Sequence, residues 1–139
     1  MAAPIIVRPT LFAIYAFNLE IARAPWFTRE AIIAEMRLQW WHDALEEIAT
    51  GGSVRRHQVV TPLSTILSPT LARDLQRSVT ARRWDVYNEP FCNDESFKIY
   101  IEETSSPVLA AAAHSLGAVE DEVISNFAYA MGLAKFFLA

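Results

Sequence analysis

The chain has 139 residues, of which 53% are hydrophobic and 12% aromatic, and its formal net charge is −4 at pH 7. This length predicts about one domain, and the apolar content excludes an intrinsically disordered chain. Nucleic acid is excluded as an expected partner, because phosphate binding needs clustered basic residues and the 12 Lys and Arg here are spread along an acidic chain.

The first half of the chain predicts two helices and a loop. Apolar residues at helical spacing predict a helix from about Thr10 to Arg23, where Pro25 ends it. Thr28 is the expected N-cap of a long second helix, which ends at Gly51-Gly52. The stretch 51–62, GGSVRRHQVVTP, is expected to be a loop.

The second half predicts helices separated by short breaks. A short helix is expected after Pro62, and a longer one follows Pro69 and runs through Trp84. After the break YNEPFC, Asn93 or Asp94 is expected to cap a long helix over 94–117. No run has strand periodicity, so the fold class is all-α.

The last predicted helix starts near 120 and is still apolar and periodic at Ala139. The acidic run 120–122 suits its first turn, since carboxylates stabilise the positive end of the helix dipole. We therefore expect residues 1–139 to be part of a larger helical domain, or to lack the surface that covers this helix.

Two polar residues fall inside apolar helix faces. Asn18 lies within the apolar stripe of the first helix, and Ala22 is the next residue along that line. Arg37 lies mid-stripe on the second helix, beside Trp41. A buried guanidinium requires a carboxylate, backbone carbonyls or an anionic ligand. We favour an internally paired or snorkelling arginine that stacks on Trp41 over an arginine that binds an anionic ligand.

Other acidic residues are expected to be surface charge. The pairs at i, i+4 spacing are Asp43 with Glu47 and Asp85 with Glu89. The three histidines have no mutual spacing that is typical of zinc. We expect no catalytic residue and no metal ligand in this chain.

Small residues and aromatic residues each allow two interpretations. In TSSPVLAAAAHS, residues 104–115, Pro107 should kink the helix, which would either widen a cavity or accompany close helix packing, and we favour packing. The aromatic set is expected in the core rather than on a cavity wall; it comprises Phe12, Phe17, Trp26, Trp40, Trp41, Phe127, Phe136 and Phe137.

Compartment signals are weak. Cys92 is the one cysteine, which favours a reducing compartment. MAAPIIVRPT is a poor signal peptide, and no window approaches 18 uninterrupted apolar residues. We expect a cytoplasmic location, with peripheral attachment to a membrane left open.

Several ordered segments carry a family resemblance. YAFNLEIAR, MRLQWWHDALEEI, ARRWDVYNEPF, FKIYIEETSSPVLAAAAHSLGA and YAMGLAKFFLA follow one another along the chain. In this order they resemble the squalene/phytoene synthase family. They are closest to its divergent bacterial branch, which is similar to the mitochondrial complex I assembly factor of that superfamily. The resemblance extends over essentially all of this chain but only about half of the family's domain.

This resemblance implies an isoprenoid (terpenoid) synthase-like helical fold around a central apolar cavity. The family's enzymes condense two prenyl diphosphates head to head, with Mg²⁺ held between diphosphate and two Asp-rich motifs. By ungapped alignment the first two aspartates fall at Ala22 and Trp26, so that motif is absent, and the second motif would come after Ala139. Mg²⁺ is therefore expected only if the full-length protein is catalytic.

Two functions of different class follow. One is a prenyl-diphosphate transferase, and the other, which the lost aspartates favour, is a non-catalytic assembly or prenyl-lipid-binding factor. The implied ligands are an isoprenoid diphosphate or a prenyl lipid, beside a protein partner. The candidate pocket residues are Tyr15, Asn18, Ala22, Arg37, Trp41, Asp85, Tyr100 and Ser105.

Overall fold

The computed structural model describes residues 3–117 and 120–138. Within these ranges the chain is helical and has no strand, which confirms the all-α fold class. The 3₁₀ helices are η1 (Ile5–Val7) and η2 (Ala24–Trp26). The α-helices are α1 (Arg8–Arg23), α2 (Ala31–Thr50), α3 (Val60–Ile66), α4 (Pro69–Ala81), α5 (Trp84–Tyr87), α6 (Asp94–Leu116) and α7 (Asp121–Leu138).

The first two helices end where the sequence predicts, but α2 begins later. Thr28 is not its N-cap: the Thr28 Oγ1 accepts from the backbone N–H of Glu30 at 3.1 Å, within the loop before the helix. Glu30 holds the N-cap position without a side-chain capping bond. The C-terminal end is as predicted, because Gly51 adopts the left-handed conformation with φ 68°, which glycine adopts at little cost.

Further along the chain, two boundaries differ from the prediction. The expected loop is shorter, since α3 begins at Val60 and so includes Pro62 in its first turn. The helix predicted to run through Trp84 ends at Ala81 and is followed by the separate turn of α5. The predicted cap of α6 is confirmed, because Asn93 and Ser96 form a reciprocal capping box.

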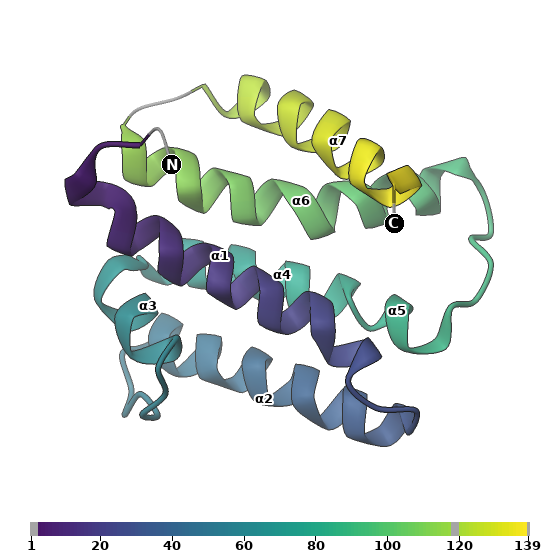
Figure 1. Cartoon of the computed structure of the whole chain (residues 1–139), viewed down its shortest axis with the longest axis horizontal. Coiled ribbons are helices and arrows are strands. Elements are labelled where there is room, and N and C mark those ends of the chain that lie inside the picture. The colour runs from purple at the N-terminus through teal and green to yellow at the C-terminus, as the bar shows by residue number, and fades with distance from the viewer. Residues whose placement is uncertain (1–2, 118–119, 139) are drawn as a thin grey trace.

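The helices pack as a chain of neighbours. α2 packs on α4, α4 on α6, and α6 on α7, while α1 crosses α6 and α3. Figure 1 shows α1 in front of α4, with α7 alongside α6 at the opposite edge from α2. The core lies between α1, α2 and α4, where Phe17 and Trp41 meet edge to face with ring centroids 5.6 Å apart.

The small-residue segment of α6 packs closely on α7, as the favoured interpretation predicts, and four of its residues also line a cavity: Thr104, Ser105, Val108 and Leu109. Pro107 is buried inside α6, and α7 packs along this segment. A Cβ added to Gly132 of α7 would overlap the Ser105 hydroxyl and lie 2.9 Å from Cγ2 of Ile101. Glycine therefore allows the two backbones to approach where a side chain could not fit.

The prediction that the aromatic set is core is wrong for most of its members. Phe17 and Trp41 are buried, and Trp40 packs against the core. The others are at least 36% exposed; they are Phe12, Trp26, Phe127, Phe136 and Phe137. Trp26 and Phe136 line a cavity, and the Phe136 ring also meets Phe97 of α6 with centroids 5.0 Å apart.

One stretch is long and apolar enough to cross a membrane, although it lacks the uninterrupted apolar run sought in the sequence. Ile5–Trp26 spans 22 residues with mean hydropathy 1.4, and 28% of its apolar window is buried. The criterion is one of length and composition, which core helices and signal sequences also meet.

Candidate functional site

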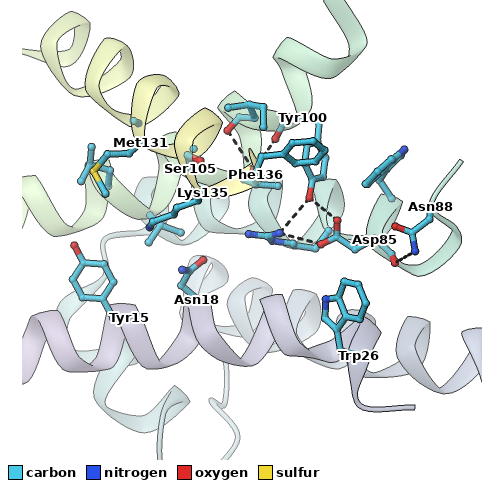
Figure 2. Close-up of a pocket in the computed structure, with 18 residues that line it drawn as sticks. Tyr15, Asn18, Trp26, Asp85, Asn88, Tyr100, Ser105, Met131, Lys135 and Phe136 are labelled. Carbon is cyan, nitrogen blue, oxygen red and sulfur yellow. Dashed lines mark hydrogen bonds and ion pairs between the residues drawn. The ribbon is translucent and has the colours of Figure 1, made fainter. Parts of the chain in front are cut away.

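A cavity of about 390 Å³ lies between α1, α6, α7 and the turn that joins α4 to α5. Figure 2 shows Tyr15 and Asn18 of α1 on one side, with Met131, Lys135 and Phe136 of α7 across from them. The remaining lining residues are Trp26, Arg82, Trp84, Asp85, Asn88, Tyr100, Ile101, Thr104, Ser105, Val108, Leu109, Ala128 and Gly132.

One end of the cavity holds a polar network of Tyr100, Asp85 and Arg82. The Tyr100 hydroxyl donates to Oδ1 of Asp85 at 2.5 Å, and Nη1 of Arg82 pairs with Oδ2 of the same carboxylate at 3.0 Å (Figure 2). Nη1 of Arg82 also lies 3.2 Å from the Tyr100 hydroxyl. Burial, followed by the hydrogen bond to Asp85, raises the pKa of Tyr100 well above its usual range. The tyrosine is therefore a neutral donor, and both oxygens of Asp85 are occupied.

Two buried polar atoms near this network lack partners. Oδ1 of Asn18 and Nε of Arg82 are shielded from solvent, and neither has a hydrogen-bond partner among the residues that the structure describes. A buried, unpaired polar group costs about 1–3 kcal/mol. Asn18, the polar residue in the apolar stripe of the first helix, therefore has an unsatisfied side-chain oxygen rather than a satisfied core contact.

Away from this network, the cavity wall carries one further cation, Lys135. Lys135 points between α7 and α1 near Met131 (Figure 2). Its ammonium has no ion-pair partner within 3–117 and 120–138. The charged lining residues are therefore two cations, Arg82 and Lys135, and one carboxylate, Asp85.

The structure brings five of the eight predicted pocket residues together at the cavity. They are Tyr15, Asn18, Asp85, Tyr100 and Ser105. Ala22, Arg37 and Trp41 do not line it. Ala22 is half-buried one turn beyond Asn18, and its side chain ends at Cβ. Trp41 is buried in the core, where its ring meets Phe17.

Arg37 is internally paired, and the expectation that it stacks on Trp41 is wrong. Nη2 of Arg37 lies 2.8 Å from Oε2 of Glu20, and its guanidinium lies 4.6 Å from the centroid of the Phe27 ring. Glu20 projects from the flank of α1 away from Asn18, so Arg37 lies on that flank and is no neighbour of Asn18 at the cavity.

The prediction of surface charge is wrong for Asp85. Asp85 is 8% exposed because the fold places it against Tyr100 from α6, which has no sequence proximity to it. For the other acidic pair the prediction fits better: Asp43 is half exposed, and Glu47 is ion-paired with Arg55.

Among the cavity residues that sequence reasoning missed are both of its cations, Arg82 and Lys135. Arg82 precedes Asp85 by three residues, a spacing that predicts an ion pair within one turn. Lys135 interrupts the apolar end of α7, a signal of the same kind as Arg37. Both signals are visible in the sequence, but only the fold places the two residues at one cavity.

Comparison with known proteins now gives the family. The family model described as squalene/phytoene synthase matches residues 1–135. The chain belongs to the squalene/phytoene synthase family. This confirms the resemblance carried by the ordered segments, together with the helical fold that the family implies.

The curated relatives have assembly-factor names. The chain is 25% identical over 130 residues to the human protein named NADH dehydrogenase (ubiquinone) complex I, assembly factor 6. It is 29% identical over 136 residues to the homologue of that protein in Drosophila melanogaster. The alignments cover 91% and 93% of this chain but 39% and 40% of the relatives. The chain thus spans about two fifths of their length. No solved structure matches it.

The described residues that line the cavity do not by themselves fit the Mg²⁺ that the family implies. Mg²⁺ takes an octahedral set of oxygen ligands, usually including carboxylates that are free to bind it. Asp85 is the one carboxylate among the described lining residues, and its oxygens are held by Tyr100 and Arg82. No group of three or more Asp, Glu, His or Cys gathers in the part of the chain that the structure describes.

Proposed function

We propose that this chain forms part of a squalene/phytoene synthase-like protein that holds an isoprenoid lipid in the helical cavity without condensing it. In this role the protein acts as an assembly or prenyl-lipid-binding factor. The observation that supports this proposal is the chemistry of the cavity wall. Both oxygens of Asp85 are already bonded, one to Tyr100 and the other to Arg82, and no second carboxylate is present among the described lining residues.

Electrostatics supports binding over catalysis. Departure of a diphosphate requires its negative charge to be stabilised as it develops, which this family achieves with Mg²⁺ and aspartates. Here Ala22 and Trp26 occupy the aligned positions, and the lining cations are Lys135 and an Arg82 already neutralised by Asp85. An apolar prenyl chain suits the rest of the wall, which includes Ile101, Val108 and Leu109 in addition to aromatic rings.

The proposed ligand size is compatible with the cavity. Binding sites for drug-sized ligands occupy about 300–1,000 Å³, and this cavity measures about 390 Å³. A single short prenyl chain is therefore a better ligand than two chains placed for head-to-head joining. Because such lipids partition into bilayers, we also propose that the protein works at a membrane surface, with a protein partner as its assembly target.

The test is incubation of the full-length protein with farnesyl and geranylgeranyl diphosphate and Mg²⁺, followed by product analysis. We expect no condensed product, together with saturable binding of a fluorescent prenyl probe that farnesol displaces. Condensed product would overturn the non-catalytic function and establish the prenyl-diphosphate transferase instead.

Two variants locate the ligand. Leu109→Trp should fill the cavity and lower probe affinity about tenfold or more, since it replaces space that the chain would occupy. Leu116→Trp is the matched control, because Leu116 lies on the same helix, is exposed and does not line the cavity. Equal affinity in both variants would place the probe elsewhere.

A further inference from the structure

Three polar side chains of the cavity wall form no side-chain hydrogen bond among the described residues. They are Tyr15 and Asn18 on α1 and Ser105 on α6. Each is uncharged and can both donate and accept, since a hydroxyl and an amide have both functions. Tyr15 and Asn18 are three residues apart and share one face of α1, and Figure 2 shows both side chains directed into the space between α1 and α7. The free hydrogen-bonding groups of this part of the wall are therefore neutral.

The charged groups of the wall are less suited to a headgroup of high charge. Nη1 of Arg82 lies 3.0 Å from Oδ2 of Asp85, so these two charges neutralise each other. Lys135 is an exposed residue, and water therefore solvates its ammonium. A diphosphate carries several negative charges, and their desolvation is costly unless cations or a metal ion surround them. One solvated ammonium and one paired guanidinium do not supply that environment.

Asn18 is the polar residue of the wall with the clearest need for a ligand. Its Oδ1 is shielded from solvent and has no hydrogen-bond donor among the described residues. The χ2 torsion of asparagine has a broad minimum, so this oxygen can turn into the cavity at little cost. An anion placed there would meet a second acceptor, whereas a hydroxyl would donate to it.

A donor without a partner lines the same cavity. Nε of Arg82 is shielded from solvent and donates to no atom of the described residues. The wall therefore offers one unused acceptor, from Asn18, and one unused donor, from Arg82. An alcohol has both complementary functions, because its hydroxyl donates one hydrogen bond and accepts others.

We propose that the cavity selects isoprenoids with a neutral alcohol headgroup over the corresponding diphosphates, and that Asn18 is the residue that recognises the hydroxyl. This inference rests on the proposed function, because it requires the prenyl chain to occupy the cavity. The hydroxyl donates to Oδ1 of Asn18, and the chain lies along the apolar part of the wall at Val108 and Leu109. A site that bonds a ligand hydroxyl discriminates against an analogue without it, because the protein's polar group is then left unpaired.

The experiment is competition against the fluorescent prenyl probe on the full-length protein. The competitors are farnesol, its methyl ether and farnesyl diphosphate, the last with and without Mg²⁺. The ether keeps the oxygen but cannot donate, so it isolates the bond to Asn18. We expect farnesol to compete about tenfold better than the ether. We expect farnesyl diphosphate to compete less well than farnesol under both conditions.

Asn18→Leu tests the residue itself. It removes the acceptor at similar side-chain size, so the probe should still bind, while farnesol and its ether should become equal competitors. This ratio of two affinities does not respond to a general loss of folded protein. Asn126→Leu is the matched control, because it makes the same change at an exposed residue of α7 that does not line the cavity. It should leave the tenfold preference intact.

Three results would overturn the inference while the proposed function stands. They are competition by farnesyl diphosphate equal to or better than that of farnesol, equal competition by farnesol and its ether in the unchanged protein, and an unchanged preference in Asn18→Leu. In each case displacement of the probe still shows that prenyl chains occupy the cavity. Failure of all three compounds to displace the probe would instead count against the proposed function.

Discussion

The two sides of this helical array use apolar residues differently. On the side of α2, helices α3, α4, α5 and η2 all contact α2, and Trp41 and Leu38 are buried almost completely. On the opposite side, α7 packs mainly on α6. Among the described residues of α7, those that are buried are Ile124, Ala128 and Gly132. The first side is a packed core, and the second encloses a cavity.

The difference shows that hydrophobic content does not separate core from site. α7 is among the most apolar helices of the chain, yet most of its side chains remain exposed. A helix buries all of its side chains only if other helices pack on each of its faces. In the described structure, α6 is the helix that packs closely on α7. Substitutions can therefore distinguish residues that stabilise the fold from residues that shape the cavity and its surroundings.

The largest effect is expected in the core. Trp41→Ala should lower the free energy of unfolding by about 3–5 kcal/mol, because it removes a large buried ring and leaves a cavity. Phe137→Ala on α7, where the ring is 74% exposed, should change it by less than about 0.5 kcal/mol. Urea unfolding of the full-length protein measures both. Similar losses would show that the two sides are packed alike.

The polar network comes next. Asp85→Ala should cost about 3 kcal/mol in unfolding free energy, because it leaves the Arg82 guanidinium without its carboxylate and Tyr100 without its acceptor. Adding Arg82→Met should recover part of that loss, since the unpaired cation is then absent. A double variant that is no more stable than Asp85→Ala would contradict the proposed coupling.

The contact between α6 and α7 should be of intermediate strength. Gly132→Ala should cost about 1–3 kcal/mol through overlap with Ser105. Gly52→Ala is the matched control, because a Cβ there lies at an ordinary 3.6 Å from Thr50 Oγ1. Thermal unfolding compares them. Ser105→Gly should relieve the overlap in a double variant, and failure to do so would argue against this contact.

A gain of stability is expected at Asn18. Asn18→Leu should raise the free energy of unfolding by about 1 kcal/mol, since it removes a buried acceptor that has no partner among the described residues. Asn126→Leu, at an exposed position of α7, should have little effect. A loss of stability in Asn18→Leu would mean that the amide has a partner in the full-length protein.

The smallest effect concerns pH on the α2 side. Hydrogen bonding and charge from Arg55 hold the pKa of Glu47 below its ordinary value of 4.5. The pair therefore contributes up to about 1 kcal/mol of stability above the unfolded pKa, and the contribution disappears as pH falls through the lower folded pKa. Glu47→Gln should flatten this part of a stability profile measured between neutral and acidic pH. An unchanged slope would exclude the pair as its cause.

Much of the fold was predictable because local rules decide helix ends. Pro25, the Gly51 cap and the Asn93 capping box act within one turn of chain. The wrong start at Thr28 has a local cause as well, since its hydroxyl forms a bond in the loop that competes with capping. The break before α5 was missed, and it lies next to Asp85, whose contact with Tyr100 is tertiary and is not visible in a single helix pattern.

The site was predictable only in part. A helical wheel finds Asn18 because an amide in an apolar stripe is visible in one helix, and it selects Arg37 for the same reason. The helical wheel does not show which residues of other helices each of these side chains will contact. Asn18 faces the cavity, whereas Arg37 meets Glu20 and Phe27 on the other flank of α1.

By itself, the sequence determined the helical class, most helix ends and the family, because periodicity, caps and ordered segments are properties of the chain. The tertiary structure alone decided that Asp85 is buried, that Lys135 shares a cavity with Asn18, and that apolar side chains of α1 and α7 stay exposed among the described residues. The physical reason is that burial and pairing depend on which helices become neighbours, and that information is absent from any single helix.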